Sequence, residues 1–291
     1  MSFTRRGMLY ATTVLAVAGP PCVWLLARLP ATPAQTVILP IAATVVPIDA
    51  VLSREKSKQE DLLVLAQRDP LALARLAQER FQRDVRDYRC VLLKQELIGN
   101  ELTPVEEVEV RIRAHPQAVY MLWRKNAVQA KRALFRDEPA YVDKQGRKLA
   151  RVEPAGAVVR LFVKDVLMPI KGPEAEKASR RSIDECGFAT SFDLLQQYGD
   201  LARKNGVLDV RFAGLGEVDG RPTFVIVRQL PYAGPAGIYP DAKLVLHLDQ
   251  QWLLPVAIES YADAEGTALL GRYVFTQVEL NPGLTDKDFE F

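Results

Sequence analysis

The pattern of hydrophobic and polar positions changes its period along the chain. Apolar residues recur every three or four positions over residues 71–81, directly after Asp69 and Pro70, a pair that favours a helix start. Further along, apolar and polar residues alternate, most clearly over 107–113 and 243–249. Such alternation is typical of antiparallel strands with one buried and one solvated face. The sequence therefore predicts a leading helix followed by hairpins.

Other segments share this strand character. They cover residues 88–97, 119–123, 133–136, 140–143, 148–153, 158–164, 208–212, 223–230, 256–261 and 271–280. Over 182–205 the period becomes helical again, and Asp219-Gly220 favours a tight hairpin turn. Hairpins with one leading and one internal helix predict an α+β fold. We expect a strongly curved antiparallel sheet of about 10–11 strands, with the helices on its concave side.

The N-terminus carries an export signature. Arg5 and Arg6 precede an apolar run over residues 8–29. Small residues at 16–18 resemble a cleavage site, which would make residues 1–30 a signal peptide. Alternatively the whole run is a single transmembrane anchor, because about 20 apolar residues span a bilayer. We favour the anchor, since the apolar run continues beyond the cleavage site. Both interpretations place the body outside the cytoplasm, on the periplasmic side of the cell envelope.

The rest of the chain divides into a linker over residues 31–66 and a β-rich domain over 67–291. The net charge of +2 gives no indication of nucleic acid as a partner, whereas the N-terminal segment makes the membrane one. Two histidines, His115 and His247, leave little material for a metal site, and we interpret both as surface residues. No catalytic or phosphate-loop motif occurs. We therefore predict a protein that is not an enzyme and has no cofactor or metal.

Cys90 and Cys186 are the two cysteines of the body. In an exported protein they could form a disulfide. The alternative is two separate buried thiols that behave as small apolar residues. The sequence favours neither, because the separation of the two backbone positions decides the matter.

Several short motifs occur in a characteristic order. They are Asp87-Tyr88-Arg89-Cys90, Lys94-Gln95-Glu96, Tyr239-Pro240-Asp241-Ala242-Lys243 and Asn281-Pro282-Gly283-Leu284-Thr285-Asp286. In this order the chain resembles the bacterial envelope family called domain of unknown function 1571, over residues 68–291. That family is similar in architecture to the outer-membrane lipoprotein carriers. The resemblance implies an open half-barrel with a helical lid over an apolar groove, which in the carriers shelters acyl chains.

Aromatic residues on the predicted strands and on the internal helix are the candidates for such a groove. They are Tyr88, Tyr120, Trp123, Phe135, Phe162, Phe188, Phe192, Phe224, Tyr273 and Phe275. The loop over 231–237 could gate its mouth. Our hypothesis is a non-enzymatic envelope protein that binds lipid or acylated protein in this groove. The alternative is an envelope scaffold, a protein-interaction module whose core is filled and holds no small ligand.

Overall fold

The computed structural model describes residues 56–156 and 162–291 of the chain. The helices in this part are α2 (Lys56–Arg68), α3 (Pro70–Asp84), α5 (Pro173–Ala178) and α6 (Phe188–Lys204), with 3₁₀ turns η1 (Pro139–Tyr141), η2 (Ile183–Glu185) and η3 (Asp286–Phe289). The strands are β1 (Asp87–Ile98), β2 (Glu101–Leu102), β3 (Glu106–Arg113), β4 (Ala118–Lys125), β5 (Ala130–Arg136), β6 (Leu149–Pro154), β7 (Val166–Pro169), β8 (Asp209–Val218), β9 (Arg221–Gln229), β10 (Lys243–Asp249), β11 (Pro255–Tyr261) and β12 (Leu269–Leu280).

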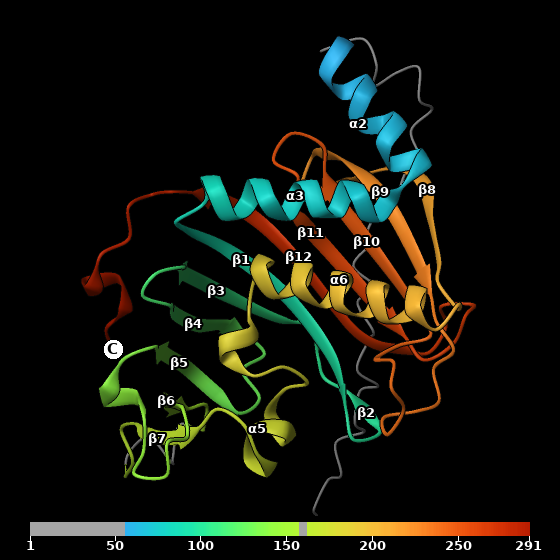
Figure 1. Cartoon of the computed structure of the whole chain (residues 1–291). Helices are drawn as coiled ribbons and strands as arrows, with labels where there is room; N and C mark the ends of the chain where they lie inside the picture. Colours follow the sequence, from blue (N-terminus) through green and yellow to red (C-terminus); the bar gives the residue numbers. More distant parts are fainter. Residues whose placement is uncertain (1–55, 157–161) are drawn as a thin grey trace, which may run out of the picture. The chain divides into compact units, whose positions relative to one another are not determined.

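The described strands form one antiparallel, 12-stranded sheet (Figure 1). Its order is β7-β6-β5-β4-β3-β1-β12-β11-β10-β9-β8, and the short β2 pairs with the end of β1. Only the junction of β1 with β12 joins segments far apart in the chain. The other neighbours on this path follow one another in sequence, with the short β2 lying between β1 and β3. The edge strands β7 and β8 do not pair with each other, so the sheet is open.

Helices α3 and α6 lie side by side across one face of the sheet (Figure 1). Asp69 caps α3 by accepting a hydrogen bond from the Ala72 amide (2.9 Å), and Pro70 occupies the first turn. The main core joins Phe81 of α3 and Phe188 of α6 to the inner face of the sheet. The α+β fold, an open half-barrel of antiparallel strands with helices on its concave side, is confirmed.

The predicted N-terminal segment and linker fall only partly within the described residues. Residues 1–55, which include the predicted signal peptide or anchor and most of the predicted linker, lie outside the described residues. Helix α2 occupies the end of the linker range, and its Leu63 and Ala66 are buried in the main core. No helix within 56–156 and 162–291 combines the length and hydropathy required to cross a membrane.

Two strand predictions need revision. The strand expected over 140–143 is wrong, because Pro139 starts a 3₁₀ turn there and Val142 makes only an isolated bridge to Lys148. Most of the segment over 158–164 lies outside the described residues, and the next described strand is β7. That strand has only four residues, too few for a period to be recognised.

The end of the chain is attached to the start of the sheet by the motif residues. Asn281 accepts a hydrogen bond from the Arg86 amide (2.8 Å) and donates one to the Asp84 carbonyl (2.9 Å). Asp87 accepts from the amide of Gly283 (3.0 Å). Beyond this attachment Phe289 is buried in a small cluster with β4 and β5. These residues of the Asp87 and Asn281 motifs therefore stabilise the fold.

Candidate functional site

An apolar cavity of about 310 Å³ lies between the sheet and residues of the segment 174–198, which includes most of α5 and the first part of α6. Its apolar wall includes Leu92, Met121, Ala133, Val152, Met168 and Ile258. Pockets for small ligands are mostly apolar and measure roughly 300–1,000 Å³. The cavity is therefore at the lower end of the range for a ligand site.

The cover of the cavity is a short helix with little packing of its own. Gly172 adopts a φ of 122°, a region that favours glycine, and Pro173 then begins α5. None of the six residues of α5 is buried, and the side chains of Ala175 and Ala178 line the cavity. Since both are short, the cover leaves the space beneath it open.

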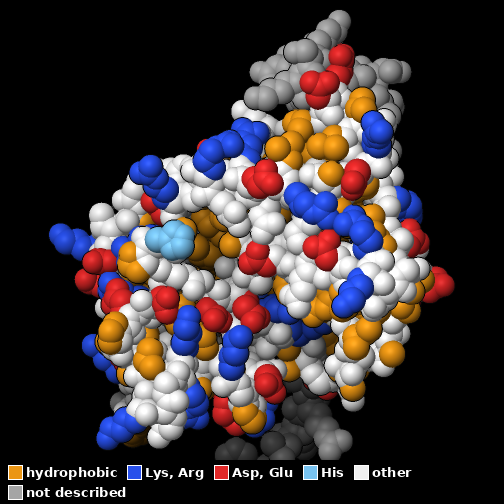
Figure 2. All heavy atoms as spheres, viewed as in Figure 1, with side chains coloured by type: hydrophobic (Ala, Val, Ile, Leu, Met, Phe, Trp, Pro, Cys, Tyr) orange, Lys and Arg blue, Asp and Glu red, His pale blue; other side chains and the backbone are white. Residues whose placement is uncertain are grey.

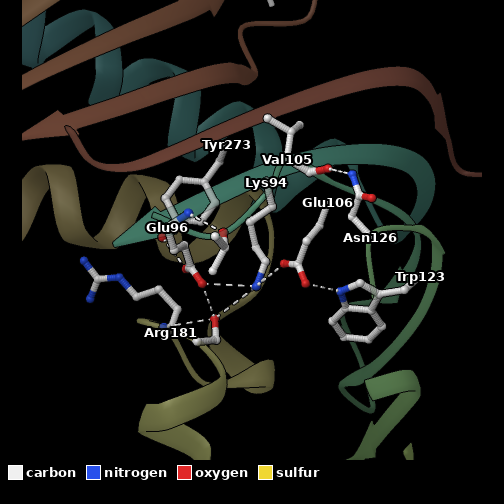
Figure 3. Close-up of polar contacts among 10 residues, drawn as sticks. Lys94, Glu96, Val105, Glu106, Trp123, Asn126, Arg181 and Tyr273 are labelled. Atoms are coloured by element: carbon white, nitrogen blue, oxygen red, sulfur yellow. Dashed lines mark hydrogen bonds and ion pairs between the residues drawn. The ribbon is translucent and has the colours of Figure 1, made fainter. Parts of the chain in front are cut away.

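Three charged residues, which we call the Lys94 cluster, lie in the wall of the cavity (Figure 3). The cluster consists of Lys94, Glu96 and Glu106, and each is nearly inaccessible to solvent. Strand register sets this arrangement, because Lys94 of β1 pairs with Tyr273 of β12 on one side and with Glu106 of β3 on the other. The Lys94 Nζ lies 3.1 Å from Glu96 Oε2 and 3.1 Å from Glu106 Oε2.

The remaining carboxylate oxygens of the cluster also have partners. The Tyr273 hydroxyl donates a hydrogen bond to Glu96 Oε1 (2.6 Å), and Ser179 Oγ donates to Glu96 Oε2 (2.9 Å). The Trp123 indole N–H donates to Glu106 Oε1 (3.0 Å). All four carboxylate oxygens thus accept hydrogen bonds, which is the condition under which buried charge is tolerated.

The pKa values within the cluster shift as this geometry requires. Burial opposes the charge of Glu96, but Lys94 and the donors Tyr273 and Ser179 outweigh it and lower the Glu96 pKa. For Lys94, burial lowers the pKa, whereas Glu96 and Glu106 raise it by more. Both shifts favour the charged forms. Burial, with the neighbouring Glu96, raises the pKa of Tyr273 well above its usual value, so its hydroxyl stays protonated and donates.

A second buried ion pair lies at another part of the lining, where Arg228 of β9 faces Asp241. Arg228 Nη2 donates to both carboxylate oxygens of Asp241, at 3.1 and 3.2 Å. The other two guanidinium nitrogens, Nε and Nη1, are buried and have no hydrogen-bond partner among the described residues. The Asp241 carboxylate thus compensates the charge of Arg228, but two of the three guanidinium nitrogens of Arg228 make no hydrogen bond among the described residues.

The structure separates the ten aromatic candidates into three groups. Trp123, Tyr273 and Phe275 line the cavity. Five others lie within the packed core and not on the cavity wall: Tyr88, Phe135, Phe188, Phe192 and Phe224. The last two are elsewhere, because Tyr120 packs with Phe289 in a separate cluster and Phe162 is 84% exposed. The loop over 231–237 contributes no lining residue, although Pro240 and Asp241 beyond it do.

The two histidines have different environments. His115 is exposed in the turn between β3 and β4, as expected. The surface position expected for His247 is wrong: only 2% of this residue is accessible, and its Nδ1 lies 3.1 Å from Thr223 Oγ1. Burial lowers the pKa of His247, which favours the neutral ring. Among the described residues, no group of three or more His, Cys, Asp or Glu could hold a metal ion.

Cys90 and Cys186 are both free thiols in the structure, so a disulfide between them stays a prediction. Cys186 lines the cavity, whereas Cys90 is buried in the core. Burial raises the pKa of Cys186 to about 12 and that of Cys90 well above its usual value. Both are therefore protonated near neutral pH and weakly reactive.

The Lys94 cluster was not among the predicted site residues, since we interpreted acidic residues on strands as solvated charge. A signal for it was present in the sequence. Tyr88, Leu92, Lys94 and Glu96 alternate with other residues along β1, so that all four share one face of the strand. When the apolar members of such a set face the core, the charged members that follow them face inward as well.

Comparison with known families decides the affiliation of the chain. A family described as "Protein of unknown function (DUF1571)" matches residues 85–291. The chain belongs to the DUF1571 family. This confirms the resemblance inferred from the motifs, and the match covers the whole sheet together with α5 and α6. No curated protein sequence matches this DUF1571 member.

Solved structures similar to this DUF1571 protein are distant in sequence. MucB is 16% identical, with a TM-score of 0.43, and the match covers 76% of this chain and 63% of MucB. The lipoprotein LppX of Mycobacterium tuberculosis is 13% identical, with a TM-score of 0.40 and coverage of 75% and 98%. A LolA superfamily protein from Nitrosomonas europaea is 9% identical, with a TM-score of 0.21 and coverage of 75% and 97%. This chain thus spans less than two thirds of MucB.

Proposed function

We propose that this chain is a non-enzymatic protein of the cell envelope that binds an acyl chain, from a lipid or an acylated protein, in the cavity beneath α5. The observation that carries the proposal is the cavity itself: about 310 Å³ of largely apolar space on the inner face of the sheet. Burying an acyl chain there would contribute roughly 0.8 kcal/mol per CH₂ group.

The location in the envelope rests on the N-terminal sequence. The paired arginines and the apolar run over residues 8–29 favour export, with the segment acting as a membrane anchor. An anchored binder would hold its ligand near the membrane from which acyl chains come. N-terminal sequencing of the mature protein separates the anchor from a cleaved signal peptide, because only the anchor retains residues 1–30.

Binding of cis-parinaric acid, a fluorescent fatty acid, to the full chain tests the acyl-chain proposal. We expect saturable binding with one site per chain. Ala178→Trp fills the cavity from α5 and should abolish the saturable component, whereas Ala189→Trp, an exposed position of α6 outside the lining, should retain it. The control also corrects for probe that binds to the apolar N-terminus. Equal binding by both variants would contradict the proposal.

The protein-interaction alternative has one observation in its favour. The edge strand β8 is unpaired on its outer side, and its first six residues are exposed or half-buried. Free strand edges can accept a strand from a partner. Under this alternative, Ala213→Pro on β8 would abolish capture of a membrane protein partner and leave binding of cis-parinaric acid unchanged.

A further inference from the structure

The charges around the cavity are not equally compensated. Among the basic residues that line it, Lys94 and Arg228 pair with buried carboxylates. Arg180 and Arg181, in the segment between α5 and η2, also line the cavity. Within the described part of the chain, neither has a carboxylate at ion-pair distance. Both residues are half-buried, and neither charge is balanced by a carboxylate of the described residues.

The carboxylates nearby are already engaged. Glu174 and Glu185 line the cavity but pair with Lys177 (2.8 Å) and Lys171 (3.1 Å). The oxygens of Glu96 and Glu106 are occupied by the donors of the Lys94 cluster. Each acidic side chain of the described lining, Asp241 with Arg228 included, thus has a partner other than Arg180 or Arg181.

The Arg180 guanidinium contacts the wall of the cavity. Arg180 Nη1 lies 3.3 Å from Ser260 Oγ on β11, to which it donates a weak hydrogen bond. The Arg181 guanidinium points away from Glu96 and Lys94 (Figure 3). The charges of both arginines act to lower the pKa of Tyr273, against its burial. Their positive potential is thus felt at the cavity wall.

We propose that Arg180 and Arg181 bind the anionic head of a single-chain amphiphile whose acyl chain occupies the cavity. This inference rests on the proposed function and specifies its ligand class. Guanidinium groups match carboxylate and phosphate oxygens in geometry and charge, and their weak hydration lowers the cost of partial burial. A carboxylate or phosphate head would supply the acceptors that the described residues do not.

The test compares ligands with the same chain and different heads on the full-length protein. Dodecanoate, dodecyl phosphate, dodecanol and dodecyltrimethylammonium each displace cis-parinaric acid. We expect one or both anions to bind at least about tenfold more tightly than dodecanol. A hydrogen bond to a charged group contributes enough free energy to change the affinity by about this factor. Which anion binds more tightly distinguishes a fatty acid from a phosphorylated head. Equal affinity of all four ligands would overturn the inference.

The double variant R180Q/R181Q should lose about tenfold in affinity for the preferred anion and keep its affinity for dodecanol. The matched control R86Q/R211Q removes two exposed arginines that do not line the cavity, and should leave both affinities unchanged. If the double variant fails to fold, the comparison of heads on the wild-type chain still decides the matter. If dodecanol and the anions all fail to bind to the wild type, the proposed function itself fails. If dodecanol binds and the anions bind no better, only this inference fails.

Discussion

Two halves of the same concave face differ in how they are filled. Beneath α3 and the start of α6, large rings occupy the space: Phe188 stacks on Tyr88 with ring centroids 4.7 Å apart and lies 6.2 Å from Phe81. Phe188 also lies 4.8 Å from Phe275, which borders the cavity and so stands between the two halves. Beneath α5, short residues such as Ala133 leave the cavity open. Hydrophobic and polar positions alternate in both halves. The difference in residue size and in the covering helix separates a core from a candidate site.

The filled half also packs closely at its backbone. The Phe188 amide donates a hydrogen bond to the Tyr88 hydroxyl (3.0 Å), which is itself buried. Gly187 also lines the cavity, so it lies where the two halves meet. Its φ is 108°, and it has no room for a side chain, because a Cβ there would lie 2.1 Å from the Tyr88 hydroxyl. In the open half α5 has no buried residue. We therefore expect mutations to cost most in the filled half and to affect ligand binding most in the open half.

The largest expected effect is that of Phe188→Ala. Since Phe188 is fully buried among three rings, its truncation should lower the free energy of unfolding by about 3–5 kcal/mol. Leu194→Ala, on the same helix but at the cavity wall and only half-buried, should cost less than about 1 kcal/mol. Chemical denaturation measures both. Equal losses would show that the two halves do not differ in packing.

The sequence predicted the elements better than the distinction between these halves. Asp69 and Pro70 start α3 through contacts with neighbouring residues, and the alternation along β1 is likewise visible within a short stretch of sequence. Such local signals suffice to predict α3 and the hairpins. The contact between Phe188 and Tyr88 joins α6 to β1, two elements separated by about 100 residues in the sequence. No local sequence pattern encodes such a long-range contact. The Lys94 cluster was missed for a different reason, because charged residues on strands usually face water.

The second prediction concerns the wall of the open half. Lys94→Met leaves Glu96 and Glu106 buried without their cation and should cost about 3 kcal/mol near neutral pH. In the wild type, the pKa of Glu96 is lower in the folded state than in the unfolded state, so Glu96 stabilises the fold at pH values above its unfolded-state pKa, and this stabilisation is lost on acidification. The pKa of Lys94 is higher in the folded state, so Lys94 stabilises the fold at pH values below its unfolded-state pKa, and this stabilisation is lost in strong alkali.

In Lys94→Met, acidification should relieve the destabilisation, whereas in the wild type acidification removes the stabilising effect of Glu96. Without Lys94, the effect of burial on Glu96 is no longer offset by a cation and raises the pKa of this carboxyl group, so protonation relieves its repulsion with Glu106. The stability difference between variant and wild type should shrink as the pH falls from about 7 to about 5. Thermal or chemical unfolding across this range measures it. A difference that grows on acidification would contradict the assigned charge states.

A smaller effect is expected in the cover of the cavity. The amides of α5 should exchange hydrogen at least about tenfold faster than those in the middle of α3, because α5 has no buried residue and α3 has six. Saturation with the preferred dodecyl ligand should slow exchange in α5 and leave α3 unchanged. Hydrogen exchange followed by mass spectrometry resolves the two helices. Slowing in α3 alone would place the ligand in the wrong half.

The central claim is that the open half takes the acyl chain while the filled half does not. Methyl NMR on the full chain, with labelled Met and Ile, tests it directly, because Met121 and Met168 line the cavity, whereas Ile112 pairs with Tyr88 in the filled half and is not a lining residue. On titration with dodecanoate we expect the methyl signals of Met121 and Met168 to shift saturably while that of Ile112 stays in place. Unchanged methionine signals at saturating ligand, or an equal shift of Ile112, would contradict the account.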